Sequence, residues 1–162
     1  ISPVFAVGYT VTTACNNYTM NTGFAIPDNN TAFTVRAINV PTTASISDVN
    51  LAVNLTHTYV SDLQIILQGP MATTTQSTIF SQSCTSNDNI NATFNDQGAA
   101  IVCAATITGN VIPATPLSVF NGLNPNGNWF WKNLYCYNRC LSFVEICQSK
   151  TYSIFSRYQK LG

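Results

Sequence analysis

The sequence predicts a single all-β domain, either a sandwich or a barrel, and three observations support this fold class. Apolar and polar residues alternate over residues 49–55 and 63–67, which is the pattern of strands with one buried face. The later apolar segments are short, and turn-rich stretches such as 86–89 and 124–127 separate them, as in proteins built from many short strands. The length of 162 residues suits one domain with a sizeable core.

The strongest strand signal lies between residues 46 and 70. Two alternating runs follow each other there, and Gly69-Pro70 ends the second because proline cannot continue a strand ladder. A weaker alternation over residues 33–39 predicts an earlier strand. The alternating apolar residues are Val49, Leu51, Val53 and Leu55 in the first run and Leu63, Ile65 and Leu67 in the second.

The amino-acid composition indicates where the protein functions and which binding partners are unsuitable. Hydrophobic residues make up 46% of the chain and charged residues only 7%, about a quarter of the usual charged share. Uncharged polar surfaces of this kind are typical of secreted or cell-surface β-proteins, so we expect that localisation. The net charge is zero, which argues against nucleic acid or an anionic membrane as partner. No apolar run is long enough to predict a transmembrane span.

The beginning of the chain and its cysteines point to a processed extracellular segment. The N-terminal residues lack an initiator methionine and a basic signal-peptide region, so we interpret the chain as a fragment of a longer protein. The even number of cysteines fits an oxidising compartment. Six cysteines allow fifteen pairings, so spacing alone does not choose among them. They are Cys15, Cys84, Cys103, Cys136, Cys140 and Cys147.

The composition changes abruptly near residues 128–131. Up to Trp131 the chain has one basic and five acidic residues, whereas from Lys132 onwards it has five basic residues and one acidic residue. Three of the six cysteines lie within twelve residues of this tail. The two parts resemble different sequences joined together.

Four blocks in the same order resemble the P (Homo B) domain of kexin- and furin-like proprotein convertases and related secreted bacterial proteins. They lie at residues 24–29, 48–70, 89–96 and 116–129. The resemblance implies a jelly-roll-like β-sandwich with a Cys84–Cys103 disulfide. It also implies that the residues of the family motifs have structural roles. The motif residues are Pro27, Asp28, His57, Asp62, Gly69, Pro70, Gly122 and Trp129.

The resemblance divides the chain into an N-terminal lead-in at 1–23, a P domain at 24–131 and an atypical tail at 132–162. After Trp129 the acidic turn and the second tryptophan strand of the family are absent from the sequence. We interpret the tail as the product of a reading-frame shift or a misassigned gene end. The closing strands of the sandwich are then expected to be missing, which would leave core strands as exposed edges.

Catalysis by histidine and calcium binding by aspartates are the two kinds of chemistry that the sequence could support, and each has a structural alternative. His57 is the only histidine, but no nucleophile-elbow motif accompanies it, so we expect an exposed or half-exposed imidazole hydrogen-bonded near Asp62 or to the backbone. Asp48, Asp62 and Asp96 match family positions, and carboxylates are suitable calcium ligands. Calcium binding by these three residues is one hypothesis, and loop support is the alternative that we favour.

The resemblance implies a non-catalytic accessory domain that stabilises a secreted subtilisin- or kexin-like serine endopeptidase. Its expected partner is the subtilisin-like catalytic domain of the same polypeptide. The alternative is a surface adhesion or carbohydrate-binding jelly-roll module of a multidomain secreted protein. The chain by itself is expected to have no enzymatic activity.

Overall fold

The computed structural model describes residues 7–24, 32–70, 75–134 and 139–155, and these form nine strands and two short 3₁₀ helices. The strands are β1 (Val7–Phe24), β2 (Thr34–Val40), β3 (Ile46–Thr56), β4 (Gln64–Gln68), β5 (Gln76–Ser81), β6 (Asn89–Ala99), β7 (Thr106–Val111), β8 (Gly127–Leu134) and β9 (Arg139–Phe155). The 3₁₀ helices are η1 (Val60–Asp62) and η2 (Leu117–Phe120).

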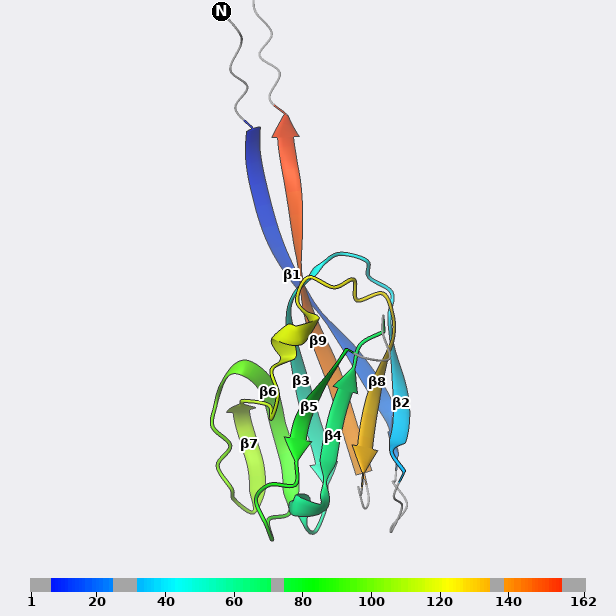
Figure 1. The fold of residues 1–162 in the computed structure, drawn as a ribbon, viewed down its shortest axis with the longest axis vertical. Helices are drawn as coiled ribbons and strands as arrows, with labels where there is room; N and C mark the ends of the chain where they lie inside the picture. The colour runs from blue at the N-terminus through cyan, green and yellow to red at the C-terminus, as the bar shows by residue number, and fades with distance from the viewer. Residues whose placement is uncertain (1–6, 25–31, 71–74, 135–138, 156–162) are drawn as a thin grey trace, which may run out of the picture.

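The strands form two sheets that pack face to face (Figure 1). The larger sheet has the order β1-β9-β3-β6-β7, and the smaller has the order β2-β8-β4-β5. All neighbouring strands are antiparallel except β6 and β7. Without β7, the order 1-9-3-6 over 2-8-4-5 is that of two four-stranded sheets joined as a jelly roll. The predicted fold class is therefore confirmed.

The alternating sequence pattern determines which face of each strand lies in the core. In β3 the alternating residues Val49, Leu51, Val53 and Leu55 are buried, and each is at most 2% exposed. Leu63, Ile65 and Leu67, at and within β4, are fully buried on the facing sheet. One cluster of buried side chains fills the space between the sheets, and Trp129 and Trp131 are its largest members.

The tail contributes the strands that close the sandwich, so the expectation that they are missing is wrong. Strand β8 lies between β2 and β4, and β9 lies between β1 and β3. Neither β3 nor β4 is left as an edge. The change in composition did not interrupt the structural pattern, because Trp129, Trp131 and Asn133 alternate into the core across it. The reading-frame interpretation and the three-part division stay predictions.

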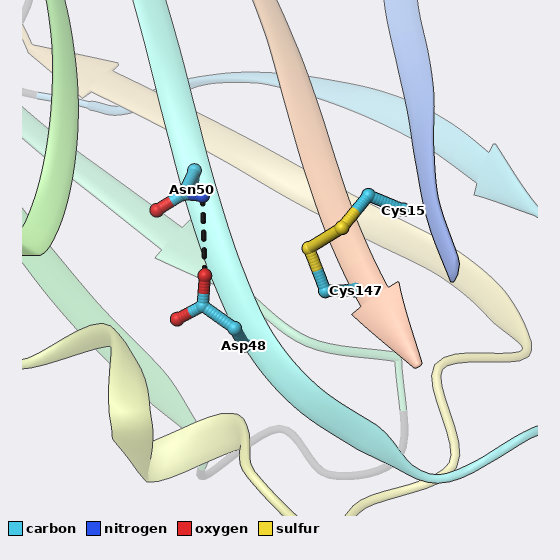
Figure 2. Close-up of a disulfide and its surroundings, with 4 residues drawn as sticks. All are labelled: Cys15, Asp48, Asn50 and Cys147. Atoms are coloured by element: carbon cyan, nitrogen blue, oxygen red, sulfur yellow. Dashed lines mark hydrogen bonds between the residues drawn. A yellow bond between two sulfur atoms is a disulfide. The ribbon is translucent and has the colours of Figure 1, made fainter. Parts of the chain in front are cut away.

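The two ends of the chain are joined in the larger sheet. Strands β1 and β9 pair from Val7 opposite Phe155 to Met20 opposite Ser142. A disulfide joins Cys15 and Cys147, which are directly opposite each other in this pairing. Figure 2 shows this disulfide beside Asp48, which lies opposite Cys147 on the neighbouring strand β3. The partner of Cys15 therefore comes from the tail.

Among the described residues, no helix is long and apolar enough to cross a membrane.

Candidate functional site

His57 follows β3 directly and is buried, with 7% of its surface exposed. The expectation of an exposed or half-exposed imidazole is therefore wrong, because the chain turns into the protein after Thr56 rather than continuing the strand. Its Nδ1 atom accepts a hydrogen bond from the backbone N–H of Tyr59 at 2.9 Å. Its own backbone N–H donates to the side-chain oxygen of Asn89 at 3.0 Å. These bonds connect the end of β3 to the start of β6.

The hydrogen bond to Nδ1 fixes the imidazole in a form that does not suit a Ser-His-Asp triad. In a triad, Nδ1–H donates to the aspartate and Nε2 accepts the serine proton. Here Nδ1 accepts a hydrogen bond, so the neutral ring carries its hydrogen on Nε2. The geometry assigns His57 to a turn at the end of the sandwich, and Asp62 lies exposed in η1.

Asp96 binds the backbone of η2 with both carboxylate oxygens. Its Oδ1 accepts the N–H of Leu117 at 2.7 Å, and its Oδ2 accepts the N–H of Ser118 at 2.8 Å. The N–H groups at the start of a helix have no partner within the helix, and a carboxylate stabilises them. Asp96 therefore positions η2 against the sheet, which is the loop-supporting role that the sequence suggested.

Asp48, Asp62 and Asp96 lie on different elements of the fold. Asp48 is half-buried on β3, and its Oδ2 accepts a hydrogen bond from Asn50 at 3.1 Å. Figure 2 shows this pair on the same face of the sheet as the Cys15–Cys147 disulfide. Within the described residues, no three His, Cys, Asp or Glu side chains form a group that could hold a metal ion. Calcium binding stays a prediction, without a shared three-aspartate site to support it.

Trp129 and Phe120 are the two large aromatic residues of the last family block, residues 116–129. Both are fully buried, and their ring centroids are 4.9 Å apart with the ring planes tilted by 56°. The Trp129 indole N–H donates to the carbonyl of Pro125 at 2.9 Å, which satisfies its only polar atom. The spacing between η2 and β8 thus places an aromatic pair in the core and fastens the connecting loop to it.

Glycines in this block allow the chain to turn where other residues would be strained. Gly122 has a φ of +82° and Gly127 a φ of +124°, both in the region that favours glycine. A Cβ atom on Gly127 would lie 2.9 Å from the Cβ of Pro70. Gly69 is similarly close to Phe120, because a Cβ there would lie 3.2 Å from the phenyl ring. The Gly69-Pro70 turn and the last family block therefore pack directly on each other.

Of the remaining predicted residues, the two cysteines are described by the structure and two motif residues are not. The structure contains the Cys84–Cys103 disulfide, which joins residues 19 apart in the sequence. It connects the loop after β5 to the loop between β6 and β7. Pro27 and Asp28 lie outside the described residues.

Several core residues were not found by sequence reasoning. Trp131 and Asn133 are fully buried on β8. The signal was available, because the period of two that places Trp129 in the core continues through both residues. Ser77 was also missed, and it donates to the carbonyl of Thr115 at 2.6 Å. Nothing in the local sequence indicates that bond.

Comparison with known proteins decides the family. The family model described as the proprotein convertase P-domain matches residues 46–132, which is more than half of the chain. The chain belongs to the proprotein convertase P-domain family. This family is a non-catalytic accessory domain of proprotein convertases. The matched segment includes β3 to β7 and most of β8, together with the turns described above.

Two solved structures resemble the fold. The serine protease of Aeromonas sobria has 16% sequence identity and a TM-score of 0.49, with 91% of this chain and 28% of that chain covered. The complex of that protease with its chaperone gives 15% identity and a TM-score of 0.49, with 93% and 28% covered. The chain thus spans about 28% of the length of these proteins. A search of curated protein sequences finds no significant match.

Proposed function

We propose that this P domain is a non-catalytic accessory module that accompanies and stabilises a secreted serine endopeptidase of the subtilisin or kexin type. The observation that carries the proposal is the family match over residues 46–132. Its partner is the catalytic domain of the same polypeptide. The expected role follows from the family, whose name places such domains in proprotein convertases.

The roles of the motif residues support a scaffold rather than a catalyst. Trp129 and Phe120 are buried against each other, and Gly122 and Gly127 shape the loop between them. Asp96 uses both carboxylate oxygens to hold backbone N–H groups. These side chains hold the sandwich together. A stable folded domain can in turn support a neighbouring domain by packing against it.

The disulfides support secretion. Cys15–Cys147 and Cys84–Cys103 join strands and loops across the domain. Structural disulfides form and persist in secreted proteins, whereas the cytosol keeps thiols reduced. Extracellular function therefore agrees with a domain that is held together in this way.

The test is to express the protease domain encoded beside this chain with and without the chain, in an oxidising compartment. The accessory role predicts that the yield of active protease, counted by titration with a serine-reactive inhibitor, falls several-fold when the chain is absent. Trp129→Ala, which opens the buried core, should have a similar effect. Thr108→Ala changes an exposed side chain of β7 and should preserve the yield.

Two results would contradict this function. An equal yield of active protease with and without the chain would exclude the stabilising role. Peptide hydrolysis by the purified chain, sensitive to a serine-reactive inhibitor and retained through repurification, would show that the chain is itself an enzyme.

A further inference from the structure

The paired ends of the chain extend beyond the sandwich as a two-stranded arm, made of residues 7–13 of β1 and 149–155 of β9. Strand β3 pairs with β9 only as far as Gln148. Beyond that point the arm consists of β1 and β9 alone, and Figure 1 shows these two strands projecting beyond all the other strands. A two-stranded ribbon is marginally stable in water. The arm therefore gains most from pairing with a further strand.

The outer edge of β1 lacks the usual protection against such pairing. Strand β1 is the outermost strand of its sheet, and among the described strands only β9 pairs with it. Its 18 residues contain no charged residue and no proline, although natural proteins block edge strands with these residues. Its one irregularity, between Met20 and Phe24, lies outside the arm. The β9 side of the arm, in contrast, contains Lys150.

The backbone geometry shows which groups face that edge. The Cα atoms of Cys15 and Cys147 are 3.9 Å apart. In antiparallel sheets, the opposed residues that are not hydrogen-bonded to each other are about 4.5 Å apart, and those that are hydrogen-bonded about 5.5 Å. Cys15 therefore directs its N–H and C=O away from β9. Because this direction alternates along a regular strand, the same holds for Val7, Tyr9, Val11 and Thr13.

We propose that a second copy of this chain pairs antiparallel along the arm edge of β1, so that two arms form one continuous four-stranded ribbon. A strand antiparallel to its own copy is self-complementary, because each outward N–H finds an outward C=O across a two-fold axis. The strand carries no charge and the chain has a net charge of zero, so like charges do not oppose the pairing. The two-fold symmetry closes the assembly at a dimer. This inference is independent of the proposed protease-associated function.

The test is sedimentation equilibrium of the 162-residue chain over a wide concentration range. We expect a species of twice the 17.6 kDa chain mass that dissociates on dilution. Thr13→Pro removes one outward N–H, and proline is tolerated where a strand N–H faces solvent. This variant should weaken the dimer about tenfold or more. Thr13→Ala keeps the N–H and should dimerise like the parent chain.

Additional measurements separate loss of pairing from loss of folding. Tryptophan fluorescence should be unchanged in Thr13→Pro, since Trp129 and Trp131 are fully buried in the sandwich. Val11→Pro removes another outward N–H and should reproduce the effect. The proposal is overturned if the chain is monomeric at every concentration, or if both proline variants dimerise like the parent. A dimer that migrates as a covalent species on a non-reducing gel would also overturn it.

Discussion

The Cys15–Cys147 disulfide should contribute more to stability than any other cross-link described in the structure. It joins residues 132 apart in the sequence, whereas Cys84–Cys103 joins residues only 19 apart. A disulfide stabilises a protein mainly because it restricts the unfolded chain, and the restriction grows with the length of the closed loop. The perturbation is to replace each pair by serine, one pair at a time.

Loop closure predicts the size and the order of the two effects. The chain-entropy relation gives about 5 kcal/mol for the 132-residue separation and about 3.2 kcal/mol for the 19-residue separation. Both values are upper bounds when the native state relaxes after the cross-link is lost. Their difference, about 1.7 kcal/mol, depends only on the ratio of loop lengths. At a urea m-value of about 2 kcal/mol/M this difference separates the unfolding midpoints by about 0.9 M.

Urea unfolding followed by tryptophan fluorescence measures these effects. Both variants are made in a background with Cys136→Ser and Cys140→Ser, so that the two remaining cysteines can pair only with each other. Each free energy of unfolding is extrapolated with its own m-value, because loss of a cross-link exposes more surface in the unfolded state. A stabilising osmolyte keeps the weaker variant folded at the start of the titration. If the Cys84–Cys103 variant is equally or more destabilised, loop closure does not determine the stabilities.

Three further substitutions test the core, the loop and the cap, with free energies of unfolding from the same urea assay. Trp129→Phe should cost about 1–3 kcal/mol, because it leaves a void and removes the indole hydrogen bond. Gly127→Ala should cost about 1–3 kcal/mol, and more than Gly109→Ala, because both glycines have positive φ but only Gly127 lies against a neighbouring side chain. Asp96→Asn should cost about 1–2 kcal/mol, because it weakens two hydrogen bonds to backbone N–H groups, whereas the exposed Asp88→Asn should change stability by less than about 0.5 kcal/mol.

Local periodicity predicted the central strands but not the strands at the two ends. The runs at 49–55 and 63–67 became parts of β3 and β4, because alternating side chains can bury one face within a single strand. Strand β1 was missed, since its residues are rich in threonine and asparagine and carry no clear alternation. Its place in the sheet depends on β9, more than a hundred residues away. Pairing over that distance leaves no local pattern in either strand.

The closing strands were not predicted, because a change in composition does not by itself interrupt the strand pattern. A change in charge balance alters the outward-facing positions, whereas the core requires only that alternate positions be apolar. Trp129 and Trp131 satisfy that requirement up to the predicted break, and the buried Asn133 continues the alternation beyond it. The sequence did not indicate the hydrogen-bond partners of the motif residues. The bond from Tyr59 to His57 and the bonds from η2 to Asp96 arise from turns whose shape no spacing rule specified.

The position of β9 shows why the domain extends beyond its family signature. The family match ends at Lys132, yet β9 begins at Arg139 and lies between β1 and β3. A chain that stopped after β8 would leave β3 with an unpaired edge and β1 without its only described partner. The jelly roll therefore closes only when the last strand enters between the first and the third. Because both strands meet there, the Cys15–Cys147 disulfide joins β1 to β9 and forms the base of the arm.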